Sequence, residues 1–222
     1  MTAPASVRPS DAIVLLGPGT ALREWESMDG KAAGWTLNKD GSMTVKKGTG
    51  NVQTRRKFGS YQQYLEWRIP AAIRGNDQAR GNSGLFLGST GAGDAGYELQ
   101  IIDSYNNKTY VNGQAGSIYK QSPPLVNAMR PPGEWQTYDV IWNAPSFNVD
   151  GSVKAPARVT VFHNGILIQD NFALTGETAW KGPPKYRAHG PLPIKLQDHG
   201  DASQPITFRN IWIRKLIAPV GN

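Results

Sequence analysis

The 222-residue sequence contains no cysteine, which excludes disulfide bonds and thiolate metal sites. No run of apolar residues approaches the ~20 residues that a membrane-spanning helix needs, so we expect no insertion into a membrane. Residues 1–10 are small, polar and rich in proline, and they lack the apolar stretch of a signal peptide. We expect these residues to form a flexible segment at a mature N-terminus.

Concentrated charge of one sign is also missing. The 24 lysines and arginines exceed the 17 aspartates and glutamates and give a net charge of +7, but they are spread thinly. The densest basic cluster, Arg55–Lys57, is typical of an exposed turn. No basic stripe alternates with aromatic residues, so we expect no binding to nucleic acid. The positive balance fits solubility or attraction to an acidic polysaccharide.

Helical periodicity is nearly absent, and short runs with a period of two residues take its place. Glycines (25) and prolines (16) mark many turns between these runs. Asn164-Gly165 predicts a two-residue hairpin turn of the kind that needs positive φ. The predicted strands are Ala12–Leu16, Trp35–Leu37, Ser42–Lys46, Asn51–Thr54, Tyr61–Ile69, Ser83–Leu87, Tyr97–Ile102, Trp135–Trp142, Arg158–His163, Ile166–Gln169, Ile194–Leu196 and Ile206–Arg214.

Many short strands separated by turns are typical of an all-β sandwich or jelly roll. The sequence shows no linker and no internal repeat, so we expect one domain over residues 11–218. Two stretches, Ser104–Gly133 and Thr175–Pro193, lack sustained alternation. Long irregular segments in a compact domain are often functional. We expect both to border the same end of a sheet, the first as an ordered loop over a cleft.

The run from Tyr97 to Asp103 is the most informative strand. Side chains alternate along a strand, so the apolar residues of this run share the core face. Glu98 and Gln100 then lie side by side on the opposite face, with Asp103 at the end of the strand. A solvated outer face would have the same pattern.

Two other predicted strands carry polar side chains on one face. Alternation places Glu66 opposite the apolar residues of its strand, and it groups Lys195, Gln197 and His199 on one side of the later run. Glutamate, glutamine, lysine and histidine on one face would form the hydrogen-bonding surface that a sugar needs. The seven tryptophans either fill the core or stack on sugar rings.

Only three histidines are present. His163 precedes the Asn-Gly turn and is expected to be structural or exposed. His189 and His199 stand beside glycines at the ends of segments, where functional side chains are often displayed. With a carboxylate they could bind a divalent metal, although no His-x-His or His-x-x-x-His spacing supports this. A nucleotide-binding glycine fingerprint, a phosphate loop and a Gly-x-Ser-x-Gly elbow are all missing.

Several motifs in one order resemble the 3-keto-disaccharide hydrolase family, formerly a domain of unknown function. The resemblance runs from about Asp11 to Leu216. The motifs are Gly81–Gly84, Tyr97–Tyr105, Gly113–Tyr119, Gly133–Gln136, His163–Gly165, Leu196–Gly200 and Phe208–Arg214.

The resemblance implies a concanavalin A-like jelly roll of two curved antiparallel sheets, with the active cleft on the concave face. It also implies export, to the periplasm or outside a bacterial cell, and a role in the breakdown of oxidised glycosides. The partner would be an oligosaccharide or glycoside substrate.

Glucanases of the same fold carry Glu-x-Asp-x-x-Glu on a central strand. The matching positions here are Glu98, Gln100 and Asp103. Gln100 cannot replace the middle carboxylate, which disfavours ordinary double displacement. The resemblance implies other chemistry. A ketone at C3 acidifies the C2 proton, so a base can remove it, the C1 leaving group can depart, and water can then add.

We therefore predict Glu98 and His199 as the acid–base pair, without deciding which is the acid. A divalent metal could assist, and its ligands are not specified. A non-catalytic carbohydrate-binding module is one alternative, and an endo-glycanase that uses Glu66 and Glu98 is another. The residues predicted to contact substrate are Gln100, Glu66, Asn82, Lys195, Gln197, Arg209, Asp103 and His189.

Overall fold

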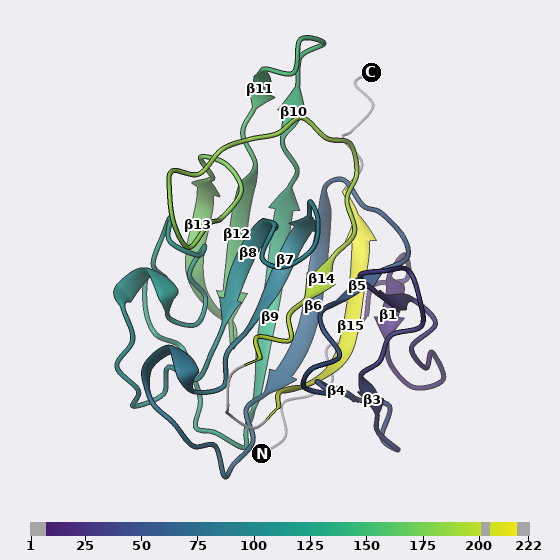
Figure 1. Ribbon diagram of the computed structural model, residues 1–222, viewed down its shortest axis with the longest axis vertical. Helices are drawn as coiled ribbons and strands as arrows, with labels where there is room; N and C mark the ends of the chain where they lie inside the picture. Colours follow the sequence, from purple (N-terminus) through teal and green to yellow (C-terminus); the bar gives the residue numbers. More distant parts are fainter. Residues whose placement is uncertain (1–7, 201–204, 217–222) are drawn as a thin grey trace.

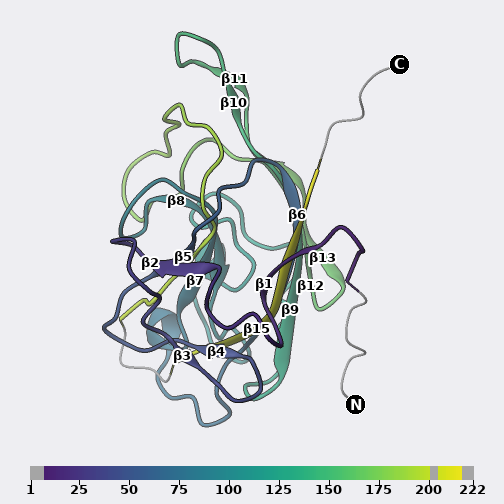
Figure 2. The same ribbon diagram turned by 90° about the vertical axis from the view of Figure 1, so that its right-hand side faces the viewer.

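The computed structural model describes residues 8–200 and 205–216, and the chain forms an antiparallel β-sandwich. Most of the expected N-terminal segment, and the end of the expected domain, lie outside the described residues. Figure 2 shows the two main sheets as separate layers, with β2, β5, β7 and β8 on one side and β6, β9, β12, β13 and β15 on the other. The predicted all-β jelly-roll sandwich is confirmed.

One layer is an eight-stranded sheet. Strand β1 (Ile13–Leu16) pairs with β15 beside the main path of this sheet. The path runs in the order β13 (Ile166–Ala173), β12 (Arg158–His163), β9 (Trp135–Asn143), β6 (Tyr61–Arg68), β15 (Thr207–Lys215), β4 (Met43–Thr44) and β3 (Thr36–Leu37).

The other layer is a five-stranded sheet. A separate hairpin of β10 (Ser146–Phe147) and β11 (Val153–Ala155) projects from one end of the molecule (Figure 1). Two single turns of 3₁₀ helix, η1 (Asp77–Ala79) and η2 (Val111–Gly113), lie in loops, and no helix of the described residues is long and apolar enough to cross a membrane. The strand order in this layer is β2 (Trp25–Ser27), β5 (Val52–Thr54), β14 (Lys195–Leu196), β7 (Ser83–Ser89) and β8 (Gly96–Ile101).

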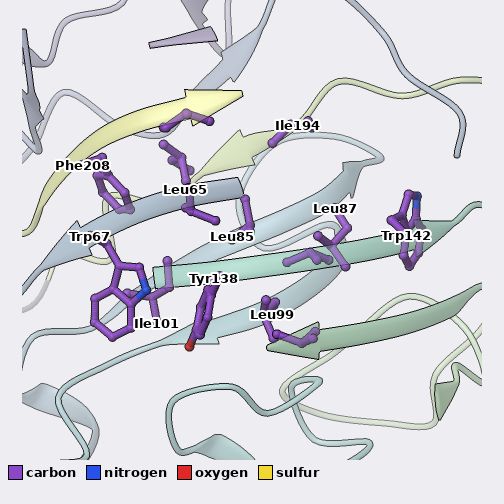
Figure 3. Close-up of a cluster of buried hydrophobic side chains, with 14 of the residues drawn as sticks. Leu65, Trp67, Leu85, Leu87, Leu99, Ile101, Tyr138, Trp142, Ile194 and Phe208 are labelled. Carbon is purple, nitrogen blue, oxygen red and sulfur yellow. The ribbon is translucent and has the colours of Figure 1, made fainter. Parts of the chain in front are cut away.

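The core lies between the two layers. Figure 3 shows side chains of both sheets meeting there, among them Trp67 of β6, Tyr138 of β9 and Leu99 of β8, all fully buried. The Tyr138 hydroxyl donates a hydrogen bond to the carbonyl oxygen of Gln100 at 2.8 Å. Burial of apolar area and this link between the sheets fix β8 against the larger sheet.

His163 belongs to this core. Its ring packs against Trp67 and Tyr138, with ring centroids 5.8 and 4.8 Å away. Burial lowers its pKa to about 3, so the imidazole is neutral near pH 7. Of the two expectations for His163, the structure shows the structural one.

Every predicted strand is present, and the structure adds β2, β10 and β11. These three contain only two or three residues each. The predicted hairpin turn is confirmed, because Asn164 (φ 53°) and Gly165 (φ 81°) connect β12 to β13 with positive φ at both positions.

This turn allows a clean stability test. A Cβ at Gly165 would have nothing within 4 Å, so Gly165→Ala changes only the backbone preference. We expect it to lower the free energy of unfolding by about 1 kcal/mol, measured by urea denaturation. Gly59 also has open space but no positive φ, so Gly59→Ala should be neutral or slightly stabilising. Equal losses in the two variants would contradict the assignment of this turn.

Candidate functional site

A cavity of about 490 Å³ lies on the outer face of the five-stranded sheet. Its volume is in the range of small-ligand sites. No lysine or arginine of the described residues lines it. The lining residues are Gln78, Asn82, Asp94, Glu98, Gln100, Tyr110, Tyr119, Thr178, Ala179, Trp180, Gln197 and His199.

Strand β8 supplies the floor of this cavity. Glu98 pairs with Phe86 of β7, and Gln100 pairs with Gly84, so these residues share the outer face, opposite the core residue Leu99. The alternation predicted for this strand is confirmed. Gly84 leaves room for the Glu98 carboxyl group, because a Cβ at this position would contact the Glu98 carboxyl oxygen and displace it.

Two loops enclose this outer-face carboxyl, because Tyr119 and Thr178, one from each loop, line the same cavity as Glu98. Residues 116–119 run along the free edge of β8, where the backbone N–H of Tyr119 donates to the carbonyl oxygen of Glu98 at 3.1 Å. The Thr178 hydroxyl accepts from the backbone N–H of Glu98 at 3.0 Å. Only 5% of Glu98 is exposed. The loops therefore convert a solvated sheet face into an enclosed site.

Burial raises the pKa of Glu98 to about 8. The negative charge of Asp94 contributes to this rise, while the positive charge of Lys195 opposes it. Glu98 forms no ion pair with a described residue. It therefore holds its proton at neutral pH.

Gln100 and Asn82 line the cavity together with Glu98 and His199. In the orientation that satisfies its neighbours, the Gln100 amide nitrogen donates to Glu98 Oε1 at 3.0 Å and to the Ser83 carbonyl at 3.2 Å. In that orientation the Gln100 amide oxygen lies 3.2 Å from Asn82 Oδ1, whereas in the opposite orientation the Gln100 amide nitrogen donates to this oxygen. Asn82 Nδ2 lies 3.2 Å from Nε2 of His199, which follows β14 and is exposed. The predicted pair, Gln100 and Asn82 thus line one cavity.

Aromatic side chains from both irregular segments border the cavity, as expected from the sequence. Tyr110 and Tyr119 come from the first segment, and their hydroxyls hydrogen-bond at 2.7 Å. Trp180 comes from the second segment and is 65% exposed. An exposed indole at the edge of a polar cavity is suited to stack on a sugar ring.

Asp94 is a site residue that the sequence analysis missed. It lies in the loop between β7 and β8, and its Oδ1 accepts a hydrogen bond from Gln197 Nε2 at 2.7 Å. Gln197 lines the cavity as predicted. The sequence signal that could have indicated Asp94 is the glycine-rich stretch from Gly91 to Gly96, which forms a turn between two strands that carry site residues.

The prediction that Glu66 shares this surface with Glu98 is wrong. Glu66 lies on the outer face of the eight-stranded sheet, where it forms an ion pair with Arg209 (Nε–Oε2, 2.6 Å) and accepts from Asn210 at 3.0 Å. The guanidinium of Arg209 covers the ring of Trp135, 3.9 Å from its centroid. Alternation gave the outward direction within each strand correctly, but it could not assign the strand to a sheet. An endo-glycanase using Glu66 with Glu98 is therefore excluded.

Asp103, His189 and Lys195 also lie outside the cavity lining, contrary to the common surface predicted for the substrate contacts. Asp103 is fully buried and pairs with Arg80 at 2.6 Å. His189 Nε2 is 2.8 Å from the Tyr97 hydroxyl, at the edge of the core. Lys195 is fully buried beneath a loop. For Lys195, alternation predicted the outward face but not the loop that covers it.

The sequence left open whether a divalent metal binds at the site. Among residues 8–200 and 205–216, no three or more histidine, aspartate or glutamate side chains cluster so that they could hold a metal ion.

Comparison with solved structures identifies relatives of the whole chain. A candidate glycosyl hydrolase from Parabacteroides distasonis is 53% identical, with a TM-score of 0.88 over 94% of this chain and 85% of that one. A second from the same organism is 22% identical, with a TM-score of 0.68 over 93% and 94% of the two chains. An alginate lyase, Aly36B, shares the fold at 14% identity, with a TM-score of 0.51 over 93% and 97%.

No curated protein matches the chain. The sequence profile of the 3-keto-alpha-glucoside-1,2-lyase-like domain matches residues 11–214, nearly the whole chain. Together with the first P. distasonis structure, this match supports a carbohydrate-related function. The chain belongs to the 3-keto-alpha-glucoside-1,2-lyase-like family.

Proposed function

We propose that the protein cleaves 3-keto-glycosides by elimination followed by addition of water, with Glu98 as the general acid and His199 as the base. The observation that carries this assignment is the burial of Glu98, which raises its pKa to about 8, in a cavity that it shares with an exposed histidine. A protonated carboxyl can donate to a leaving group, and an imidazole is suited to accept a proton near neutral pH.

In the elimination step, His199 removes the C2 proton, which the C3 ketone acidifies. The electron pair of the C2–H bond forms the enolate and then the C1–C2 double bond, while the bond from C1 to the glycosidic oxygen breaks. Glu98 gives its proton to the departing oxygen. The side-chain amides of Gln100, Asn82 and Gln197 are available to stabilise the enolate oxygen.

Addition of water reverses the roles of the two groups. The water oxygen bonds to C1, its proton passes to the Glu98 carboxylate, and the His199 imidazolium returns a proton to C2. The net reaction is hydrolysis, and both side chains regain their starting states.

The cavity also favours an uncharged sugar. It contains two carboxyl side chains, Asp94 and Glu98, and no lysine or arginine of the described residues. A uronate would lack a cationic partner there, since carboxylate recognition commonly uses arginine or lysine. Trp180 offers an apolar surface for one face of the ring. An exported location remains a prediction from the resemblance.

Glu98→Gln separates an enzyme from a binding module. The change keeps the shape and hydrogen bonding of Glu98 but removes its proton donor, so we expect kcat on a 3-keto-glucoside to fall about 10²–10⁴-fold with KM largely kept. Glu26 lies on the same sheet outside the cavity lining, and Glu26→Gln should retain the parent rate. Turnover at the parent rate in Glu98→Gln would refute the acid role. A binding module would show no turnover in any form.

Elimination also predicts an isotope outcome. In deuterated water the proton returned to C2 comes from a group that exchanges with solvent, so the released sugar should carry deuterium at C2. A no-enzyme control over the same time corrects for exchange of the ketone itself. The unoxidised glucoside should not be cleaved, because its C2 proton is not acidic. Mass spectrometry of the released sugar measures the label. Cleavage of both substrates without deuterium at C2 would instead favour displacement at C1.

A further inference from the structure

Lys195 is a charged residue with no role in the proposed elimination and hydration steps. It lies on β14, between Gln53 of β5 and Phe86 of β7, and it is fully buried. Its Nζ atom is 3.9 Å from the centroid of the Phe86 ring. Burial lowers its pKa to about 8 even though nearby carboxylates oppose this shift. A buried ammonium is costly unless its hydrogen bonds are satisfied.

Those hydrogen bonds all go to one loop. Lys195 Nζ donates to the carbonyl oxygens of Gly91 at 3.2 Å, Gly93 at 2.7 Å and Ala95 at 2.9 Å. An ammonium has three N–H groups, so each has an acceptor. Asn51 Nδ2 adds a fourth donor, to the Gly93 carbonyl at 3.0 Å. The loop between β7 and β8 is thus folded around a single cation.

Asp94 lies within this arrangement, because Gly93 and Ala95, the residues on either side of it, both bind the ammonium. The Asp94 carboxylate accepts from Gln197 and lines the cavity with Glu98. Its charge raises the pKa of Glu98. The position of the loop therefore determines the electrostatic environment of the proposed acid.

We propose that Lys195 is a positioning residue that holds the loop between β7 and β8 so that the carboxylate of Asp94 faces Gln197 and Glu98. The expected effect of Lys195 on catalysis rests on the proposed function. The positioning of Asp94 by Lys195 does not depend on that function. Lys195 lines none of the cavity, so its effect on catalysis runs through Asp94.

The contact can be tested without activity. The Gln197 side-chain amide gives an NMR signal, assigned by its loss in Gln197→Leu, that reports the hydrogen bond to Asp94. We expect Lys195→Met to move this signal to the position it has in Asp94→Ala. Lys154 is exposed on the projecting hairpin, and Lys154→Met should leave the signal unchanged. An unchanged signal in folded Lys195→Met would overturn the proposal.

The catalytic consequence is tested by a double-mutant cycle of Lys195→Met and Asp94→Ala at pH 6, below the pKa of Glu98. Lys195→Met alone should lower kcat/KM by up to about 10²-fold, as expected for a displaced site group. In the Asp94→Ala background its further effect should be below about threefold, because the two changes share one mechanism. Full additivity would show a separate structural role and overturn the proposal.

Two safeguards keep the outcomes distinct. If Lys195→Met does not fold, Lys195→Arg replaces it, because a planar guanidinium cannot reproduce the three bonds of the ammonium. If the parent protein cleaves no 3-keto-glycoside, the proposed function fails, while the NMR comparison still decides whether Lys195 positions Asp94.

Discussion

The site depends on one constraint, the burial of a carboxyl group on the outer face of a sheet. Alternation along β8 sends Leu99 into the core and therefore sends Glu98 outward. Water would normally reach such a residue, but Glu98 is only 5% exposed in a cavity that Tyr119 and Thr178 also line. Without an ion-pair partner among the described residues, Glu98 keeps its proton at neutral pH. A solvent-exposed Glu98 would be an ordinary carboxylate, and the proposed acid would be lost.

Glu66 shows what the same residue type does when the surroundings differ. It also lies on the outer face of a sheet, but Arg209 pairs with it at 2.6 Å and stabilises its charge. Near Glu98 the cation is Lys195, whose three donors bind loop carbonyls instead. The charge of Lys195 thus stays close while its hydrogen bonds are used to place Asp94. One sandwich accordingly contains an ion-paired glutamate on one outer face and the proposed acid on the other.

The strands, the Asn164-Gly165 turn and the outward direction of Glu98, Gln100 and Gln197 could be predicted from the sequence, because alternation and turn chemistry are local. The assignment of Glu66 to the other sheet could not, since parity is the same in both layers. The burial of Lys195 could not be predicted either, because it depends on a loop more than 90 residues away in the chain.

The protonation state of Glu98 is the central claim, and it can be measured directly. Glutamate labelled with ¹³C at the side-chain carboxyl gives a resonance for Glu98, assigned by its absence in Glu98→Gln, that shifts as the group ionises. Because the folded-state pKa is raised, the proton should be retained through neutral pH and lost as the pH rises through about 8. A transition near the ordinary value of 4.5 in the folded protein would contradict the assignment of Glu98 as the acid.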